Sequence, residues 1–417
     1  MKITILTYGS QGDVEPFAAL AQGLLQAGFQ VKLAAPEYYR SRFDVQGLEF
    51  VGLPGEPAHL VQELVDRAGM NGLRMVREMG RFVLPLADQV LIQSRAACAD
   101  ADGIIHSFLF TSTGLSLGEE LGIPTFSAQL FPVFSPTSEF TAPTFPDLPL
   151  GGGYRVLTHK AVSLIFKGGS RMLYAWLRMK NPHLPRLPRW IPDERRGGST
   201  PILYGFSSQV VPRPQDWPDQ ARITGYWLLD ERDERAPGKE IEDFLRSGPP
   251  PITIAFGSTV TRKSQTIYQT ILKALDACNQ RGIIVADKIH LPHASQDVLQ
   301  VDYAPYRWLF NRSAAVIHHG GAGTTGRGLM AGVPNIILPF TSDQPFWGNR
   351  VYQLGLGPRP IPVKKLSLDR LSEAVLTVIQ DAGMRDRAQA IGEKLREEDG
   401  VSQAVAFIQE SLQNQIG

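Results

Sequence analysis

A glycine-rich run in the second half of the chain has the residue types of an anion site. It begins with His318 and His319, continues through Gly320–Gly323 and ends in Thr324 and Thr325. A strand-like segment precedes it and a helix is expected to begin near Thr324, so successive N–H groups should point at one spot. Glycines alone are weak evidence, because they also serve ordinary turns. The histidines before them and the hydroxyls behind them favour a phosphate ligand.

A carboxylate–amide pair, Asp343 and Gln344, follows the next expected strand, Asn335–Leu338, after a short loop. A carboxylate accepts hydrogen bonds and an amide both accepts and donates, which suits the neighbouring hydroxyls of a sugar. Alone, an aspartate in this place is typical of a helix N-cap. Together with the glycine-rich run, the pair predicts a site for a phosphate-bearing sugar.

A further carboxylate, Asp13, ends the turn Gly9–Asp13 between an expected strand, Ile3–Thr7, and a helix expected from Pro16. The carboxyl end of a parallel strand is where such folds bind ligands. The alternative is an N-terminal carboxylate that stabilises the helix dipole by about 0.3–1 kcal/mol. A helix N-terminus also lowers a carboxylate pKa, so action as a base would require an apolar, desolvating pocket.

Short apolar runs alternate with helical patterns in both halves of the chain, which predicts an α/β fold with parallel sheets. The first half has expected strands at Ile3–Thr7, Val31–Ala34, Glu49–Leu53, Gly103–His106 and Thr125–Ala128, and the second half at Ile252–Phe256, Ile283–Ala286, Ala314–Ile317 and Asn335–Leu338. Prolines interrupt the pattern at 132–149 and 182–192. An acidic, proline-bearing stretch, 230–240, is the expected linker between domains 1–229 and 241–417.

Composition narrows the class of protein. The chain has 417 residues, 43% of them hydrophobic, which is enough for two ordinary cores. A formal net charge of +1 gives no field that would recruit nucleic acid. Cys98 and Cys278 lie in apolar helical patterns and are expected to be reduced core residues in the cytoplasm. With neither a leader pattern nor about 20 consecutive apolar residues, any membrane contact is expected to be peripheral.

The segment from Leu148 to Pro192 contains no Asp or Glu but many basic residues among apolar ones. The basic residues are Arg155, Lys160, Lys167, Arg171, Arg178, Lys180, Arg186 and Arg189. A basic amphipathic segment of this kind can lie on an anionic membrane surface. The other interpretation is a solvated helix face whose lysine and arginine stems cover an apolar groove.

Segments in both halves resemble one family, the inverting nucleotide-sugar-dependent glycosyltransferases of the GT-B fold, in the branch of sterol glucosyltransferases and vancomycin-type antibiotic glycosyltransferases. The segments are Thr7–Phe17, Gly225–Asp230, Phe256–Thr259, Ala304–Phe310, His318–Pro334 and Pro339–Val351. The resemblance implies two Rossmann-like doubly wound domains facing across a cleft. It also implies acceptor binding by the first domain and donor binding by the second, with the last helix packing back on the first.

The resemblance also implies roles for individual residues. Asp13 takes the position of the catalytic base, and His318 takes that of the diphosphate ligand. His319 would then face away from the ligand and pack inside the domain. Gly321, Gly323, Thr324 and Thr325 complete the phosphate turn, and Asp343 and Gln344 contact the sugar. Further contacts to the phosphate or sugar are implied for Ser10, Gln11, Ser258 and Thr259. Tyr303 lies where relatives stack an aromatic ring on the nucleobase of the donor. Arg327 departs from the family's small residue; it would either place a cation one helical turn from the phosphate site or point to solvent.

The expected reaction is transfer of a hexose from UDP-glucose to a hydroxyl of a lipophilic acceptor. Aromatic residues after Phe108, among them Phe131, Phe134, Phe140, Phe145, Phe166 and Trp176, favour such an acceptor. The sequence lacks a DxD-like acidic pair and clustered His or Cys ligands, which predicts a metal-independent enzyme without a cofactor. The alternatives are a dTDP-sugar (rhamnosyl-type) transferase and a non-catalytic sugar-nucleotide-binding relative. A dinucleotide oxidoreductase is disfavoured, because the first turn has only half of the G-x-G-x-x-G pattern.

Overall fold

The computed structural model describes residues 1–43, 45–56, 84–180, 200–229, 237–257, 264–286, 291 and 296–416. Within these residues the chain forms two compact units. Unit 1 consists of Met1–Phe206, Arg213–Leu229 and Asp399–Gly417, and unit 2 of Ser207–Pro212 and Asp230–Glu398. Much of the expected linker, residues 230–236, lies outside the described residues.

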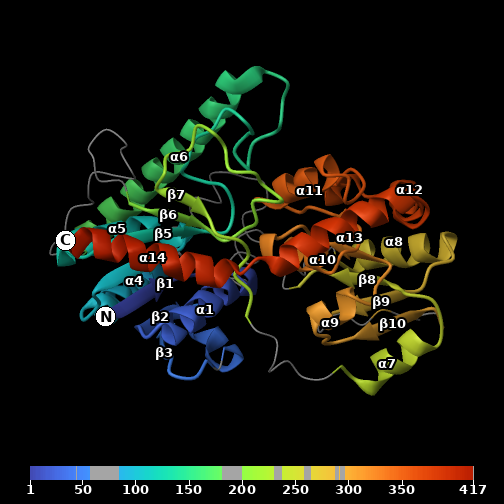
Figure 1. The fold of residues 1–417 in the computed structure, drawn as a ribbon, viewed down its shortest axis with the longest axis horizontal. Helices are drawn as coiled ribbons and strands as arrows, with labels where there is room; N and C mark the ends of the chain where they lie inside the picture. Colours follow the sequence, from blue (N-terminus) through green and yellow to red (C-terminus); the bar gives the residue numbers. More distant parts are fainter. Residues whose placement is uncertain are drawn as a thin grey trace. The chain divides into compact units, whose positions relative to one another are not determined.

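Unit 1 is built on a seven-stranded parallel sheet with strand order β3-β2-β1-β4-β5-β6-β7 (Figure 1). The strands are β1 (Lys2–Leu6), β2 (Gln30–Pro36), β3 (Glu49–Leu53), β4 (Gly103–His106), β5 (Thr125–Gln129), β6 (Ile202–Tyr204) and β7 (Ala221–Ile223). The strand order reverses between β1 and β4, which pair in register from Ile3 opposite Gly103 to Leu6 opposite His106. Ligands of doubly wound sheets bind beyond the carboxyl ends of the strands at such a reversal.

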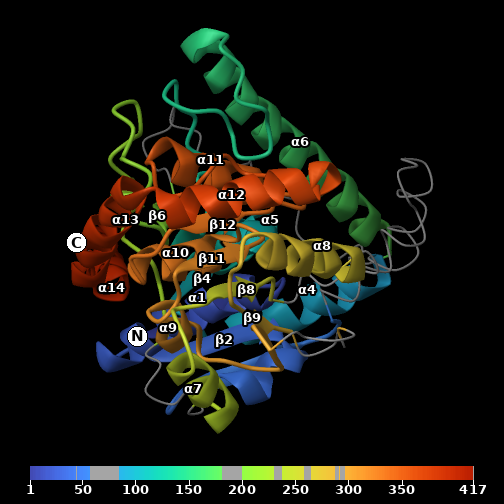
Figure 2. The same cartoon turned by 90° about the vertical axis from the view of Figure 1, so that its right-hand side faces the viewer.

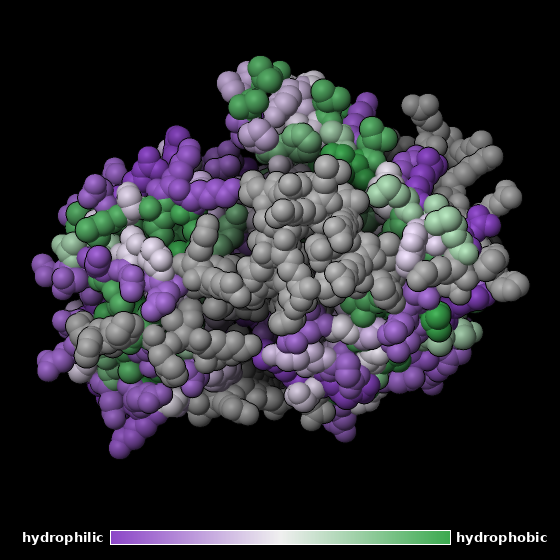
Figure 3. All heavy atoms as spheres, turned by 180° about the vertical axis from the view of Figure 1, so that it is seen from behind, coloured by the Kyte–Doolittle hydropathy of each residue, from purple (hydrophilic) through white to green (hydrophobic). Residues whose placement is uncertain are grey.

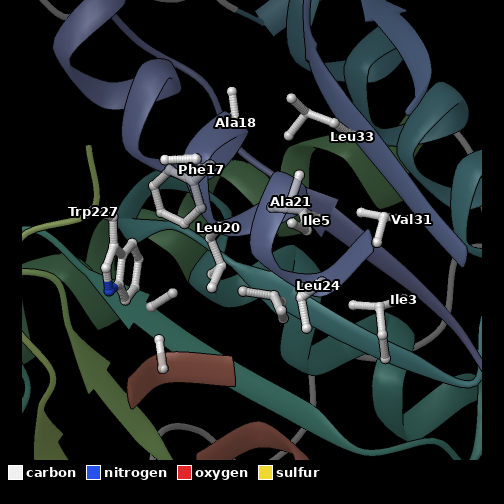
Figure 4. Close-up of a cluster of buried hydrophobic side chains, with 14 of the residues drawn as sticks. Ile3, Ile5, Phe17, Ala18, Leu20, Ala21, Leu24, Val31, Leu33 and Trp227 are labelled. Carbon is white, nitrogen blue, oxygen red and sulfur yellow. The ribbon is translucent and has the colours of Figure 1, made fainter. Parts of the chain in front are cut away.

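Helix α1 (Gln11–Gln26) packs its apolar face on this sheet. Figure 4 shows Phe17, Leu20 and Leu24 of α1 directed toward Ile3 and Ile5 of β1, with Trp227 beside them. The predicted helix start at Pro16 is wrong, because the helix already begins at Gln11 and Pro16 lies inside it. Proline removes the bond to the carbonyl of Gly12, but Gly12 is exposed and water can satisfy that group.

The remaining helices of unit 1 are η1 (Glu37–Arg42), α4 (Leu84–Cys98), η3 (Phe108–Phe110), α5 (Thr111–Leu121), α6 (Gly151–Lys180) and α14 (Gly400–Ile416). The last of them, α14, packs on α1 although the two are far apart in the sequence. Its Ala404, Val405 and Ile408 are part of the same hydrophobic core as Phe17, Leu20 and Leu24. Gly23 of α1 permits this approach, because a Cβ there would lie 2.3 Å from Cγ1 of Val401.

Unit 2 has a five-stranded parallel sheet of order β10-β9-β8-β11-β12. Its elements are α7 (Lys239–Arg246), β8 (Ile252–Ala255), α8 (Ser264–Ala277), β9 (Gly282–Val285), β10 (Val298–Val301), α9 (Tyr306–Phe310), β11 (Ala315–His318), α10 (Ala322–Met330), β12 (Asn335–Ile337), α11 (Gln344–Gln353), η6 (Val363–Lys365), α12 (Leu368–Gln380) and α13 (Ala382–Glu397). Helices α8 and α12 lie side by side over one face of the sheet (Figure 2). The strand order reverses between β8 and β11, so the glycine-rich run after β11 lies at the reversal point.

The two parallel sheets confirm the predicted α/β class, and all nine predicted strands occur within two residues of their expected ends. Cys98 and Cys278 are both buried and free, as predicted. The guanidinium of Arg350 in α11 donates to the carbonyl of Val210 at 2.7 and 3.0 Å, which holds the segment Ser207–Pro212 in unit 2.

The core position of α14 can be tested by substitution. Ile408→Ala removes a fully buried side chain from the core of unit 1 and should lower the free energy of unfolding by about 2–5 kcal/mol. Glu410→Ala, at an exposed position of the same helix, should change it by less than about 0.5 kcal/mol. Equal effects of the two substitutions in chemical denaturation would show that α14 does not contribute to this core.

Candidate active site

Asp13 lies in the first turn of α1, at the carboxyl edge of the unit 1 sheet and at its reversal point. The backbone N–H of Ser10 donates to Asp13 Oδ2 at 2.8 Å, and the Ser10 hydroxyl donates to the same oxygen at 2.7 Å. Gly9 has a φ of 144°, and a Cβ there would lie 2.5 Å from Asp13 Oδ2. Only glycine therefore permits this carboxylate position. Both bonds end on Oδ2, which leaves Oδ1 as the oxygen able to take a proton.

Burial raises the pKa of the Asp13 carboxyl above its usual value, and the two hydrogen bonds from Ser10 only partly offset the effect. The carboxyl keeps some exposure, but protein atoms surround it densely. The buried phenol of Tyr39 lies close enough to feel this charge, since Asp13 contributes, after burial, to raising the pKa of Tyr39 to about 12. Sequence analysis missed Tyr39, because no motif links it to the turn. The desolvation required of a base is present.

Ser10 and Gln11, expected to reach the donor, both have partners within unit 1. Ser10 donates to Asp13, and the Gln11 amide donates to Glu15 at 3.2 Å and accepts from Arg42 at 2.9 Å. Their arrangement fits support of Asp13 and of the helix start better than a reach toward phosphate.

Four phenylalanines gather beyond the ends of β4 and β5, at the same edge of the sheet as Asp13. Phe108 lies 5.2 Å from Phe131, 5.6 Å from Phe134 and 4.7 Å from Phe166, measured between ring centroids. Phe134 has a φ of 69°, in the region that side-chain-bearing residues seldom adopt. Phe140 pairs instead with Trp217, at 6.2 Å. We name Phe108, Phe131, Phe134 and Phe166 the phenylalanine cluster.

The glycine-rich run forms a tight turn between β11 and α10. Gly320 has a φ of 89°, and a Cβ there would lie 2.7 Å from Ile337 Cγ2 and 3.1 Å from the Gln344 carbonyl oxygen. Gly321 is the N-cap of α10, so the helix begins two residues before the predicted Thr324. The first N–H groups of α10, with Gly323 and Thr324 among its first three residues, are the anion-binding element that the sequence predicted.

His318, the expected diphosphate ligand, is fully buried and both of its ring nitrogens have partners. Nε2 donates to Asn335 Oδ1 at 2.9 Å, and Nδ1 accepts from the backbone N–H of Gly320 at 3.1 Å. Burial lowers the pKa of His318 to about 3. His318 is therefore a neutral residue that fixes the turn.

His319 was expected to pack inside the domain. In the structure it is the histidine whose ring faces the glycine-rich turn. It keeps some exposure, and its Nε2 lies 2.5 Å from the place where a Cβ on Gly321 would be. Its Nδ1 has no hydrogen-bond partner among the described residues. The Thr325 hydroxyl, in the first turn of α10, likewise has none in that part of the chain. Burial lowers the pKa of His319 to about 4, so it can donate a hydrogen bond to an anion but brings no charge.

Arg327 brings a cation to the same turn. Its Nη1 lies 3.6 Å from the place where a Cβ on Gly323 would be, one helical turn earlier. The direction follows from helix geometry, because side chains lean toward the helix N-terminus. The positive potential at this turn thus comes from N–H groups and a guanidinium, with both histidines neutral.

Asp343 and Gln344 begin α11 after the left-handed Ser342, whose φ is 62°. Asp343 is at the N-cap position but makes no capping hydrogen bond, and its Oδ2 accepts from the indole N–H of Trp347 at 2.8 Å. Gln344 Oε1 accepts from the backbone N–H groups of Phe340 at 2.8 Å and Thr341 at 3.1 Å. A carboxylate and an amide therefore lie side by side at the start of α11.

The remaining predicted site residues differ in where they lie in the structure. Tyr303 is exposed between β10 and α9. Ser258 and Thr259 lie outside the described residues. His106, at the end of β4, is fully buried against Gly114 of α5, where a Cβ would lie 2.5 Å from its ring. Among the described residues, no group of three or more His, Cys, Asp or Glu is placed to hold a metal ion.

Comparison with known proteins identifies two family domains. Residues 3–138 match the glycosyltransferase family 28 N-terminal domain, and residues 269–406 match the C-terminal domain of erythromycin biosynthesis protein CIII-like proteins. An O-mycaminosyltylonolide 6-deoxyallosyltransferase of Streptomyces fradiae is 34% identical over 98% of this chain and 97% of its own. A sterol 3-beta-glucosyltransferase of Emericella nidulans is 34% identical over 99% of this chain, which spans 30% of that relative.

Solved structures share the whole fold. The glycotransferase of kitacinnamycin has a TM-score of 0.71 at 20% identity and covers 98% of both chains. A glycosyltransferase of Streptomyces sp. SF2575, complexed with thymidine diphosphate, has a TM-score of 0.64 at 16% identity, with 98% of this chain and 99% of that chain covered.

The buried histidines predict how stability depends on pH. Burial lowers the pKa of His106 and of His319 to about 4 and that of His318 to about 3. The unfolded chain takes up these protons near pH 6.5 and the folded chain does not, so stability should fall as pH drops from about 7 to 4. Each histidine should contribute roughly 1.4 kcal/mol per pH unit below 6, with Asp13 partly offsetting the loss through its raised pKa.

Denaturant titrations of the wild type and of His319→Gln at pH 7 and pH 5 measure this effect. The variant should show a smaller loss of stability between the two pH values. Identical stability of the wild type at both pH values would contradict the burial of neutral histidines.

Proposed function

Because this chain belongs to the GT-B nucleotide-sugar glycosyltransferases, we propose that it transfers a hexose from UDP-glucose to a hydroxyl of a lipophilic acceptor such as a sterol, with inversion at the anomeric carbon. In this proposal unit 1 binds the acceptor and unit 2 the donor. The observation that carries it is the carboxyl group of Asp13, held by Ser10 at the sheet's reversal point with a raised pKa.

Asp13 acts as the general base. Oδ1 takes the proton of the acceptor hydroxyl while the hydroxyl oxygen bonds to the anomeric carbon. The bond from that carbon to the diphosphate oxygen breaks, and its electron pair leaves with the nucleoside diphosphate. Attack from the side opposite the leaving group inverts the configuration. A carboxylate with a raised pKa is a stronger base than an ordinary one, which favours the proton transfer.

The phosphate turn of unit 2 stabilises the leaving diphosphate. N–H groups at the start of α10 point at the phosphates, His319 donates a hydrogen bond, and Arg327 supplies charge. Gly321, Thr324 and Thr325 belong to this turn. Asp343 and Gln344 bind the sugar hydroxyls, with Trp347 fixing the carboxylate. We propose that the reaction needs no metal ion, so turnover in the assay with UDP-glucose should be the same with and without EDTA.

The phenylalanine cluster supports a lipophilic acceptor. It lies at the same sheet edge as Asp13, where the acceptor hydroxyl must be placed. Two similar proteins are named as a sterol 3-beta-glucosyltransferase and an O-mycaminosyltylonolide 6-deoxyallosyltransferase, which supports a small-molecule acceptor. The buried free cysteines support a reducing compartment, so we place the protein in the cytoplasm.

Two alternatives are tested by the same experiment. A dTDP-sugar donor is favoured by the thymidine diphosphate in one structural neighbour, and a non-catalytic relative would bind nucleotide without turnover. The protein is incubated with UDP-glucose or dTDP-sugars and a panel of sterol, carotenoid, hydroxy fatty acid and polyketide acceptors, and products are identified by mass spectrometry. Glucosylated product from UDP-glucose supports the proposal, and nucleotide binding without product for any pair contradicts it.

The role of Asp13 predicts a selective loss of turnover. Asp13→Asn should lower kcat by roughly 10²–10⁴ while donor binding is retained, because only the proton transfer is removed. Glu15→Gln, two residues later in α1, is the matched control and should remain near wild type. Ser10→Ala removes a hydrogen bond that lowers the Asp13 pKa, so the acid limb of kcat/KM should move to higher pH. Normal turnover in Asp13→Asn would refute the assignment.

Calorimetry can separate the roles of the phosphate turn and the sugar site. His319→Ala should weaken UDP and UDP-glucose equally, since both contain the diphosphate. Asp343→Asn, which keeps an oxygen for Trp347, should weaken only UDP-glucose. His318→Ala should chiefly lower stability, because it leaves Asn335 Oδ1 without its donor. Equal losses of affinity for UDP and UDP-glucose in Asp343→Asn would exclude separate roles for the phosphate turn and the sugar site.

A further inference from the structure

Helix α6 has 30 residues and exposes an apolar row along its length. Leu157, Leu164, Ile165, Met172 and Met179 are each between 62% and 75% exposed. They recur at intervals of about seven residues, two helical turns, so they share one side of the helix. We name these five residues the apolar stripe. A Cβ on Gly168, which lies on the same side, would meet no atom within 4 Å, so none of the described residues covers the stripe there.

The opposite side of α6 is packed against unit 1. Tyr174 and Leu177 are buried with Leu91 of α4, and the Tyr174 hydroxyl lies 3.3 Å from that of Ser116. His159 Nε2 is 3.1 Å from the Phe140 carbonyl oxygen. The helix is thus held rigidly by one face. Phe166 and Trp176 also face this packed side.

Four cations border the apolar stripe. Lys160, Lys167, Arg171 and Arg178 recur at intervals of seven, four and seven residues and so lie along one flank. We name them the basic flank. None of the four has an ion-pair partner among the described residues, and the sequence has no Asp or Glu between Leu148 and Lys180. Figure 3 shows apolar residues beside polar ones at the top of the view, where α6 lies.

We propose that the apolar stripe and basic flank of α6 bind the surface of an anionic lipid bilayer. Leu, Ile and Met side chains would enter the acyl boundary, and the lysine and arginine stems would reach the phosphate and carboxylate headgroups. Charge complementarity favours a bilayer as the partner. The basic flank matches the negative headgroup surface, and the apolar stripe beside it matches the apolar interior. No helix of the described residues is long and apolar enough to cross a membrane, so the contact is peripheral.

Bilayer binding does not depend on the proposed function, but its role in giving access to the acceptor rests on that function. A bilayer contact on unit 1 would bring the acceptor-binding unit to the medium in which a lipophilic alcohol dissolves. A few apolar side chains and cations give a reversible association, which allows the enzyme to leave with its product.

Vesicle co-sedimentation of the full chain, without donor or acceptor, tests the proposal. Binding to phosphatidylcholine vesicles containing phosphatidylserine should exceed binding to pure phosphatidylcholine and should fall as ionic strength rises. Lys167→Glu/Arg171→Glu should lower the partition coefficient at least about tenfold, and Leu164→Gln/Met172→Gln should do the same. Lys364→Glu/Lys365→Glu changes the net charge equally at exposed positions of unit 2 and should leave binding unchanged.

The outcomes separate this proposal from the proposed function. Equal binding to neutral and charged vesicles, or binding that survives both α6 variants, overturns the proposal. A dimer that dissociates in Leu164→Gln/Met172→Gln, seen by analytical ultracentrifugation, would assign the stripe to a second copy and also overturn it. Both α6 variants should keep wild-type turnover on a detergent-solubilised acceptor and lose it on a membrane-embedded one, whereas failure of the proposed function removes turnover on both.

Discussion

The candidate site depends on one steric constraint, which is the absence of a Cβ at two turns. A side chain at Gly9 would collide with the Asp13 carboxylate, and one at Gly320 would collide with Ile337 and the backbone of Gln344. Both glycines follow the strand at which the sheet order reverses, β1 in unit 1 and β11 in unit 2. Parallel strands bring the functional residues to one edge, and each glycine then lets the chain turn tightly enough to present a helix N-terminus there.

Charge at these two turns is controlled by burial more than by residue type. At Asp13 burial raises the carboxyl pKa against the effect of the helix start and the Ser10 hydrogen bonds, which turns a capping residue into a plausible base. At the glycine-rich turn burial keeps His318 and His319 neutral, so the histidines act through hydrogen bonds. The guanidinium of Arg327 is then the charged side chain near Gly323, in a position where the resembling family has a small residue.

Much of the fold could be predicted from the sequence, because each buried parallel strand is a short apolar run bounded by turn residues. Strands β6, β7 and β10 were missed, since three or four residues give little pattern, and the start of α1 was misplaced because Pro16 was taken as its first turn. The candidate site residues were proposed from residue type and spacing, which could not show how His318 and His319 are oriented. Adjacent residues at a strand end point to opposite sides, and only the contact with Asn335 on the neighbouring strand shows which one is inside.

Helix α6 shows why composition alone could not distinguish a membrane-binding segment from a solvated face. Its basic residues among apolar ones favoured the membrane in the sequence, and of the apolar ones Phe166 and Trp176 are used for packing. The exposed residues are Leu, Ile and Met, which a sequence pattern would assign to a core. A helix fixed by its aromatic face has no freedom to bury its other apolar face within unit 1, so the apolar stripe remains outward beside the basic flank. The rigid attachment that orients the phenylalanine cluster therefore also determines which side of unit 1 a bilayer would meet.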